Sequence, residues 1–345
     1  MPKKAMRETI DHVSDREAPF VSPRCDLVPL ENMRIRQDSL NAPHVEPLTD
    51  PVWVSVQDAT EMRSDDPVLG FHVDSQPYAI PWWIMKNHHV ANLTLDDRPL
   101  VVKLCEVCTS SGAFDPVVDG RRLTFMVKGA YKGTFVTMDF ETGSIWAPFL
   151  GQALLGPLEG TRLERQPVFQ SRWAEWSSLY PETLVPDGAD ETREGHGADR
   201  RPGSFESPDG LSHTLVHHDE RLPHTELVLG VECGDDARAY PLRALAGAGR
   251  ALNDRLGRMP IVVFSRPGSW MAVAFSREVD GMELEFSAAD GDEFVDAQTQ
   301  SRWNLLGRAV GGALRDRSLA FVRSGIEEWN AWASYHPQTE IFEGA

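Results

Sequence analysis

Cysteine is scarce in this chain, which has only four among 345 residues. So few cysteines exclude a disulfide framework of the kind that small secreted domains use in place of a large core. Long apolar runs are also missing: no stretch approaches the roughly 18 consecutive apolar residues needed to span a bilayer, and residues 1–13 lack the apolar segment of a secretory signal. These absences predict a cytoplasmic protein that does not enter membranes.

Basic residues are few relative to acidic ones, 34 against 52, which gives a formal net charge of −18. Such a charge opposes binding to phosphate backbones, so we expect no nucleic-acid partner. Gly-x-Ser-x-Gly, P-loop, Gly-x-Gly-x-x-Gly and His-Glu-x-x-His motifs do not occur in a fitting context, which removes the commonest hydrolase, nucleotide-binding and zinc-protease functions. A small-molecule substrate is the remaining expectation, and the sequence does not indicate an oligomeric state.

An internal repeat is the main feature that is present. Residues 99–114 align without a gap on residues 260–275. The motif Trp173-x-x-Trp176 returns as Trp329-x-x-Trp332, followed in both places by Pro-x-Thr. Because a shared scaffold explains such matches, the sequence predicts two copies of one unit.

The repeat divides the chain into four parts. Residues 1–52 form an irregular N-terminal arm, and residues 53–183 are the first repeat. Residues 184–224 are an acidic, histidine-containing connector whose composition is too polar to bury a core. Residues 225–345 are the second, degenerate repeat.

Short runs rich in β-branched and aromatic residues, bounded by turn signals, predict strands at 68–73, 100–104, 122–129 and 134–140. Helical spacing of apolar residues predicts helices at 81–92 and 171–180. The predicted fold class is therefore α+β, mostly antiparallel β, with the two tandem copies of one β-rich unit packed as a pseudo-symmetric pair.

Chemically potent side chains occur in the first copy only. Cys105 aligns with Arg266 and Cys108 aligns with Ser269, while His88 aligns with Ala248 or Gly249. Residues kept in both copies are explained by folding, whereas residues in one copy point to a site. The alignment therefore concentrates the predicted chemistry in the first repeat.

Cys105, Cys108 and His88 form a predicted metal site. Two thiolates and an imidazole suit copper, iron or zinc, and copper is favoured because Cu(I) tolerates a low ligand count. A fourth ligand would come from His89, His72 or Asp115. His89, Glu106 and Asp115 are the candidates for catalytic acid and base.

Other interpretations of these residues stay open. The cysteine pair is also compatible with inert packing or with a metal-free dithiol redox pair. The connector histidines, which have acidic neighbours, are most simply interpreted as part of a solvated segment. The paired tryptophans are most simply interpreted as core residues. The connector histidines are His213, His217, His218 and His224. Cys25 and Cys233 are interpreted as structural.

The ordered motifs of the first repeat resemble the bacterial and archaeal family known as domain of unknown function 3179. The residues that carry the resemblance are Gly70, Tyr78, Pro81, His88, Asn92, Cys105, Cys108, Asp119, Gly120, Phe125, Thr142, Ser144 and Trp146. The family pattern has Glu, Asp, Pro and Gln where this chain has His89, Leu93, Glu106 and Pro148. The resemblance supports the fold and the cysteine site and implies no particular reaction.

Together these observations predict a metal-dependent oxidoreductase, with copper or iron favoured, that acts on a small organic substrate through the Cys-x-x-Cys and His centre of the first repeat. One alternative is a non-catalytic metal-binding or metal-delivery protein. Another is a zinc-stabilised binding module, or a scaffold with inert thiols that binds a ligand through aromatics such as Trp82 and Trp83.

Overall fold

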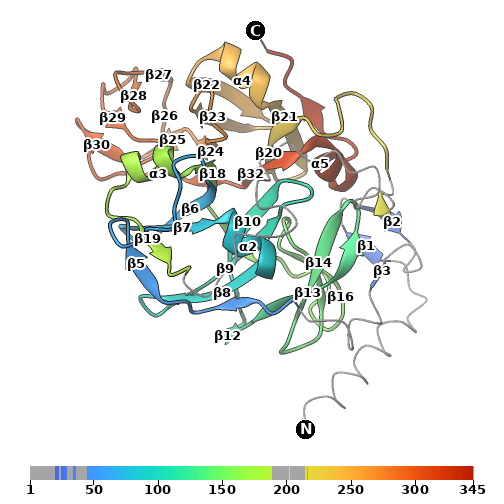
Figure 1. Ribbon diagram of the computed structural model, residues 1–345. Coiled ribbons are helices and arrows are strands. Elements are labelled where there is room, and N and C mark those ends of the chain that lie inside the picture. The colour runs from blue at the N-terminus through green and yellow to red at the C-terminus, as the bar shows by residue number, and fades with distance from the viewer. Residues whose placement is uncertain are drawn as a thin grey trace.

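The computed structural model describes residues 45–188, 202, 214–215 and 217–344, together with the backbone of three short strands before residue 36 (Figure 1). Those strands are β1 (Phe20–Ser22), β2 (Cys25–Val28) and β3 (Arg34–Ile35). Most of the predicted arm and part of the connector, including His213 and the Cys25 side chain, therefore lie outside the described residues. The described chain is mostly antiparallel β-sheet, as predicted.

Three sheets form the first half of the molecule. The first has the order β18 (Phe169–Arg172), β6 (Pro67–Val73), β7 (Gln76–Pro81), β19 (Leu184–Pro186), β5 (Trp53–Ser55). The second has the order β17 (Glu164–Gln166), β10 (Ser110–Asp115), β9 (Arg98–Cys105), β8 (Val90–Leu95), β4 (Leu48–Thr49). The third has the order β16 (Gln152–Leu155), β15 (Ile145–Ala147), β14 (Thr134–Asp139), β13 (Phe125–Tyr131), β3. Because β19 pairs with β5 and β7, the first half continues to residue 186.

The second half repeats these strand orders. Its first sheet is β32 (Ser324–Glu328), β20 (Leu227–Cys233), β21 (Asp236–Pro241), β33 (Glu340–Ile341). Its second is β22 (Ala251–Leu256), β23 (Met259–Ser265), β24 (Ala272–Ser276), β31 (Phe321–Val322). Its third is β27 (Phe286–Ala288), β28 (Phe294–Asp296), β29 (Arg302–Trp303), β30 (Ala309–Gly311). Two small hairpins are β11 (Val117–Val118) with β12 (Arg121–Arg122), and β25 (Glu278–Val279) with β26 (Met282–Glu283).

Side-chain contacts recur along with the strand orders. The indole of Trp176 covers Gly70 so closely that a Cβ there would overlap it, and Trp332 covers Gly230 in the same way. The Asn92 amide bonds the backbone N–H and C=O of Phe125, both at 2.9 Å. The counterpart amide of Asn253 bonds those of Phe286 at 2.9 and 2.8 Å. These recurrences support an internal duplication, which stays an interpretation, as does the pseudo-symmetric packing.

A carboxylate–indole contact explains why both copies keep a tryptophan in the Thr-x-Ser-x-Trp motif. The indole N–H of Trp146 donates to Asp139 at 2.8 Å, and that of Trp303 donates to Asp296 at 3.0 Å. All four groups are buried. A buried carboxylate requires donors, so the motif belongs to the scaffold.

Four helices of seven residues each complete the described chain: α2 (Trp82–His88), α3 (Trp173–Leu179), α4 (Leu242–Ala248) and α5 (Trp329–Tyr335). The helix predicted over residues 81–92 is shorter in the structure, where α2 spans Trp82–His88. It ends at His88 because His89 adopts a left-handed backbone conformation, with φ 59°, and β8 begins at Val90. No helix in the described part of the chain is long and apolar enough to cross a membrane.

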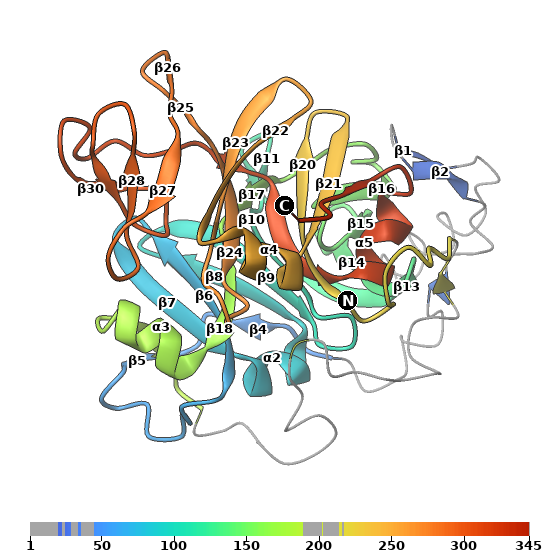
Figure 2. The same cartoon turned by 90° about the horizontal axis from the view of Figure 1, so that it is seen from above.

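The two halves meet along β10, β18 and β32, with the second half (yellow to red) lying against the first (blue to green) in Figures 1 and 2. Glu232 is buried there beside Arg162 at 3.4 Å and His336 at 3.5 Å. Burial opposes ionisation of Glu232, but His336, Arg323 and Arg162 lower its pKa to about 2. The junction therefore contains a permanently charged carboxylate neutralised by residues of both halves.

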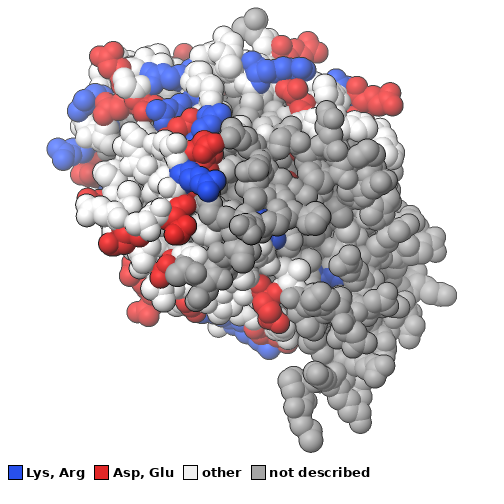
Figure 3. Space-filling view, in the orientation of Figure 1, with Lys and Arg blue, Asp and Glu red and all other residues white. Residues whose placement is uncertain are grey.

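On the surface of the described residues, acidic and basic side chains are interspersed. Figure 3 shows red and blue groups alternating over the second half, at the upper left of the view. Several of them are exposed ion pairs, such as Arg255 with Glu283 at 2.8 Å and Arg317 with Asp280 at 2.8 Å. Neighbouring charges of opposite sign largely cancel one another's field on this face.

Candidate functional site

The two cysteines of the Cys-x-x-Cys motif lie in a tight turn, which we name the cysteine turn (residues 105–109). Cys105 is the last residue of β9, opposite Ser110 at the start of β10, and Cys108 lies in the turn that joins these strands. Both are free thiols and only 2% exposed. Burial, together with a hydrogen bond to Cys105 and the charge of that thiol, raises the pKa of Cys108 well above its ordinary value. The motif spacing therefore brings both sulfurs together.

A lysine lies in the same strand as the first thiol. Lys103 is two residues before Cys105, so both side chains leave β9 on one face, with Cα atoms roughly 7 Å apart. Its side chain is fully buried, and Nζ donates to Thr137 Oγ1 at 3.2 Å. Nζ also lies 4.1 Å from the ring centroid of Phe125. Burial lowers the pKa of Lys103 to about 7, although Asp139 opposes the shift.

The second half shows what occupies these places when no lysine is present. Phe264 aligns with Lys103, and Phe294 aligns with Thr137. Their rings stack with centroids 3.8 Å apart, and Phe264 packs edge-on against Phe286, the counterpart of Phe125. An apolar pair thus fills the core without any desolvation cost. The first half instead has a buried amine on the strand that ends at Cys105, which packing alone does not require.

The second half contributes a carboxylate to the cysteine turn. Thr109 Oγ1 donates to Glu328 Oε1 at 3.0 Å, and the Glu328 N–H donates to the Cys108 carbonyl at 3.2 Å. Glu328 is 2% exposed, and burial raises its pKa to about 7, with the Thr109 hydrogen bond opposing. Its negative charge contributes to the raised pKa of Cys108. A carboxyl group that titrates near neutrality therefore lies beside the second thiol.

The turn is held against the second half by Gln170. The Gln170 amide nitrogen lies 2.8 Å from the Thr109 carbonyl and 3.1 Å from the Ile326 carbonyl, so one amide spans both halves. It also contacts Ser111 Oγ at 3.0 Å. Three acceptors around one buried NH₂ group fix the turn relative to β32.

His89 and Glu106 form a pair at the edge of the turn. His89 Nδ1 lies 3.1 Å from Glu106 Oε2 and 3.3 Å from the Leu104 carbonyl. The two side chains are 22% and 13% exposed, respectively, so the pair is only partly buried. An imidazole paired with a carboxylate is a common arrangement for general acid–base chemistry. The structure thus brings together two of the three predicted acid–base candidates.

His88, the predicted third metal ligand, lies at the end of α2. Its Nδ1 is 2.6 Å from the Glu46 carbonyl oxygen. An N–H at Nδ1 that donates to a carbonyl leaves Nε2 as the nitrogen with the lone pair, an arrangement common among metal-ligating histidines. However, the described residues contain no group of three or more His, Cys, Asp or Glu side chains placed to hold a metal ion. The structure therefore does not assemble the predicted three-ligand set, and His88 as a ligand stays a prediction.

Asp115 and His72 lie away from the turn. Asp115 is five residues beyond Ser110 along the extended strand β10, roughly 16 Å away, and its carboxylate accepts the N–H of Val117 at 2.9 Å. His72 lies in β6, where its ring packs against Trp176 and Tyr180. Asp115 is near the cysteines in sequence, but the extended strand β10 carries it away from them, and His72 belongs to a different sheet.

Lys103 and Glu328 are the residues that the sequence interpretation missed. Both were detectable as differences between aligned copies: Lys103 aligns with Phe264, and Glu328 aligns with Arg172, since each directly precedes the first tryptophan of the repeated motif. A comparison that includes every position at which the side-chain charge differs between the two halves identifies both Lys103 and Glu328.

Comparison with known proteins gives one match. The family model described as Protein of unknown function (DUF3179) matches residues 41–339. The comparisons with curated proteins and with solved structures gave no match. The matched range includes the cysteine turn, Lys103 and Glu328, so both halves of the site lie within it. Because the model matches nearly the whole chain, this protein belongs to the DUF3179 family.

Proposed function

We propose that Cys105 and Cys108 bind a soft metal ion, with copper first and iron second, and that the protein uses it as an oxidoreductase on a small organic substrate. The observation that carries the proposal is the contact between two buried thiols in a turn that has no thiols in the second half. Thiolates are preferred ligands of Cu(I), which accepts low coordination numbers. Two sulfurs suffice for such an ion, so the proposal does not depend on His88 as a third ligand.

Charge balance supports this proposal. Two thiolates and one Cu(I) ion carry a net charge of −1, which is costly in a buried site unless a counter-charge is near. Lys103 supplies a positive charge on the same face of β9 and two residues from Cys105. This role would explain why the first half has a buried amine where the second half has stacked phenylalanines.

A bound copper or iron ion would supply one-electron chemistry. The surrounding residues would handle protons. Glu328, with a pKa of about 7, is placed to receive a proton from Cys108 when that thiol is deprotonated. His89 and Glu106 would pass protons between the turn and solvent. Because both thiols are buried, only electrons and small molecules would reach them.

The donor set favours copper over zinc, since tetrahedral zinc sites use four ligands and the described residues place no third or fourth donor with the thiols. It also favours catalysis over delivery. Metal transfer between proteins requires an accessible thiol that attacks from the surface, whereas these two are 2% exposed.

Metal binding is tested by titrating the anaerobically reduced full-length protein with Cu(I) against a chromogenic chelator. We expect one tightly bound Cu(I) per chain, with loss in both Cys105→Ser and Cys108→Ser. Cys233→Ser is the matched control, because Cys233 is a free cysteine outside the turn, and its variant should bind as the wild type does. Unchanged stoichiometry in the two turn variants would refute the site.

Redox function is tested separately on the copper-loaded protein. Oxidation by ferricyanide should produce a Cu(II) electron paramagnetic resonance signal that ascorbate removes, and this cycle should be absent in Cys105→Ser. A loaded protein that cannot be cycled would overturn the oxidoreductase assignment while leaving metal binding intact.

A further inference from the structure

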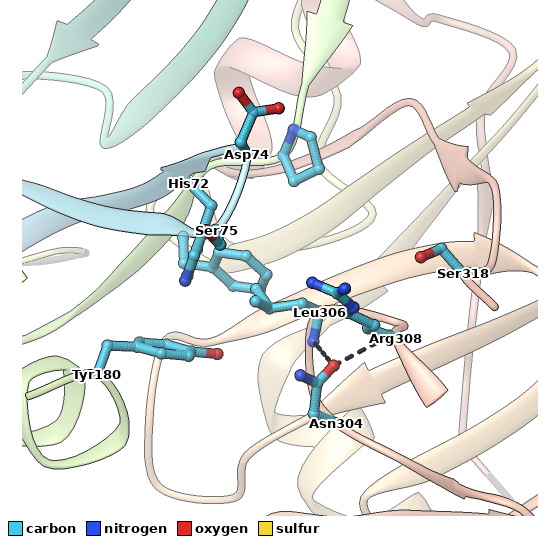
Figure 4. Close-up of a pocket in the computed structure, with 10 residues that line it drawn as sticks. His72, Asp74, Ser75, Tyr180, Asn304, Leu306, Arg308 and Ser318 are labelled. Carbon is cyan, nitrogen blue, oxygen red and sulfur yellow. Dashed lines mark hydrogen bonds between the residues drawn. The ribbon is translucent and has the colours of Figure 1, made fainter. Parts of the chain in front are cut away.

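A second candidate site is a cavity of about 420 Å³ between the two halves (Figure 4). The first half contributes His72, Phe169 and Tyr180, and the second contributes Asn304, Arg308 and Ser318. The volume lies within the range of small-molecule sites. None of these residues belongs to the cysteine turn or contacts it through a described hydrogen bond, so the cavity is independent of the proposed function.

Several hydrogen-bonding groups around the cavity lack partners within the described part of the chain. Asn304 Oδ1 accepts the N–H groups of Leu306 and Arg308, at 3.1 and 3.0 Å, which fixes the amide so that Nδ2 faces the cavity. No described hydrogen bond joins this Nδ2, the Arg308 guanidinium or the Tyr180 hydroxyl to another residue, so these groups are open to a ligand or to water. Figure 4 shows the Tyr180 hydroxyl and the Asn304 Nδ2 directed toward one another. Convergent polar groups of this kind are typical of a ligand site.

His72 adds a further unpartnered group. Its ring packs edge-on against Tyr180, with centroids 4.6 Å apart, and Nδ1 has no hydrogen-bond partner among the described residues. Burial lowers the pKa of His72 to about 4, so the imidazole is neutral at pH 7 and offers one donor and one acceptor.

Arg308 is the one cationic residue among those that line the cavity, and the carboxylates close to it are paired with other arginines. Asp74 is paired with Arg98 at 3.0 Å. Asp292, which acts electrostatically on Tyr180, is paired with Arg266 at 3.3 Å. The Arg308 guanidinium has no such carboxylate in the described chain, and three of the unpartnered groups are donors. Donors in excess and one cation without a described carboxylate partner favour a ligand rich in negatively charged acceptors.

We propose that this cavity binds a small organic oxyanion whose charged group contacts Arg308, Asn304 and Tyr180 and whose apolar body packs on Phe169. Carboxylates and phosphate monoesters share this chemistry. A planar guanidinium contacts either one through two parallel hydrogen bonds.

The test is isothermal titration of the full-length protein with three probes: phenylacetate, phenyl phosphate and the neutral phenylacetamide. We expect saturable binding of at least one anion and at least tenfold weaker binding of the amide. Whether phenylacetate or phenyl phosphate binds more tightly then distinguishes a carboxylate site from a phosphate site.

Variants locate the binding. Arg308→Gln should weaken the affinity for the anion at least tenfold, because it removes the cation. Tyr180→Phe should weaken this affinity about fivefold, as expected for the loss of one hydrogen bond. Arg315→Gln is the matched control: Arg315 is exposed nearby but does not line the cavity, so affinity should be unchanged. Circular dichroism confirms that each variant is folded.

Three results would overturn the proposal. They are the absence of saturable binding by both anions, equal binding of the amide, and wild-type affinity in folded Arg308→Gln.

Discussion

Replacing Glu328 by glutamine should make the protein less sensitive to rising pH. The carboxyl is buried, and its pKa is about 7 in the folded state against 4.5 for the ordinary group. Between these values the folded state holds a proton that the unfolded state has lost, so the free energy of unfolding falls as pH rises. Glutamine retains an oxygen that accepts the Thr109 hydroxyl but does not ionise.

The magnitude follows from the two pKa values. The difference of 2.5, at about 1.36 kcal/mol per pH unit, corresponds to a full cost of about 3.4 kcal/mol for the ionised carboxylate. About 0.8 kcal/mol of this cost is present at pH 5 and nearly all of it at pH 8. The advantage of Glu328→Gln over the wild type should therefore grow by about 2.5 kcal/mol over this range.

The assay is urea unfolding of both proteins at pH 5, 6, 7 and 8. Glu327, whose pKa burial also raises to about 7, is present in both proteins and cancels in the difference. Glu327→Gln provides the matched comparison, because Glu327 lies in the same strand but the Thr109 hydroxyl donates to Glu328 instead. A stability difference between wild type and Glu328→Gln that does not change with pH would refute the assignment of a near-neutral carboxyl to the cysteine turn.

Two further predictions concern the core. Lys103→Met removes a buried amine whose pKa is about 7 instead of 10.5, so the substitution should stabilise the protein most at low pH, where the wild type must bury a charged amine. In urea unfolding, the stability difference between the variant and the wild type should decrease by about 3 kcal/mol from pH 6.5 to 9.5, and a constant difference would contradict this. Gly70→Ala should destabilise the fold by about 2 kcal/mol or more, because the added Cβ would overlap Trp176. Gly247→Ala, in α4 with open space around it, should stabilise the fold by about 0.5–1 kcal/mol. Thermal unfolding that gave both changes the same sign would contradict the packing argument.

Local features of the fold were predictable from the sequence. The strand predicted at 68–73 is β6, and the helix predicted at 171–180 contains α3, because alternation and helical spacing act over a few residues. The helix predicted at 81–92 shows the limit of this approach. Its apolar spacing continues past His88, but the left-handed residue His89 ends the helix and the β-prone sequence after it joins a sheet. Sheet pairing overrides local spacing there.

For the site, the sequence predicts what a single turn brings together. Cys105 and Cys108 meet because only two residues separate them, and His89 meets Glu106 because β8 and β9 are neighbouring antiparallel strands. Glu328 is 219 positions from Thr109, and no local pattern encodes that contact. Only packing of the two halves creates it.

The bonds that cross from β32 to the cysteine turn have a consequence for how the protein is studied. Glu328 accepts from Thr109 and donates to the Cys108 carbonyl, while Gln170 reaches the Ile326 carbonyl. A fragment that ends in the connector would keep both cysteines but lose every one of these bonds and expose the turn to water. The thiols of such a fragment would react faster and titrate differently, so thiol reactivity reports whether the halves are docked.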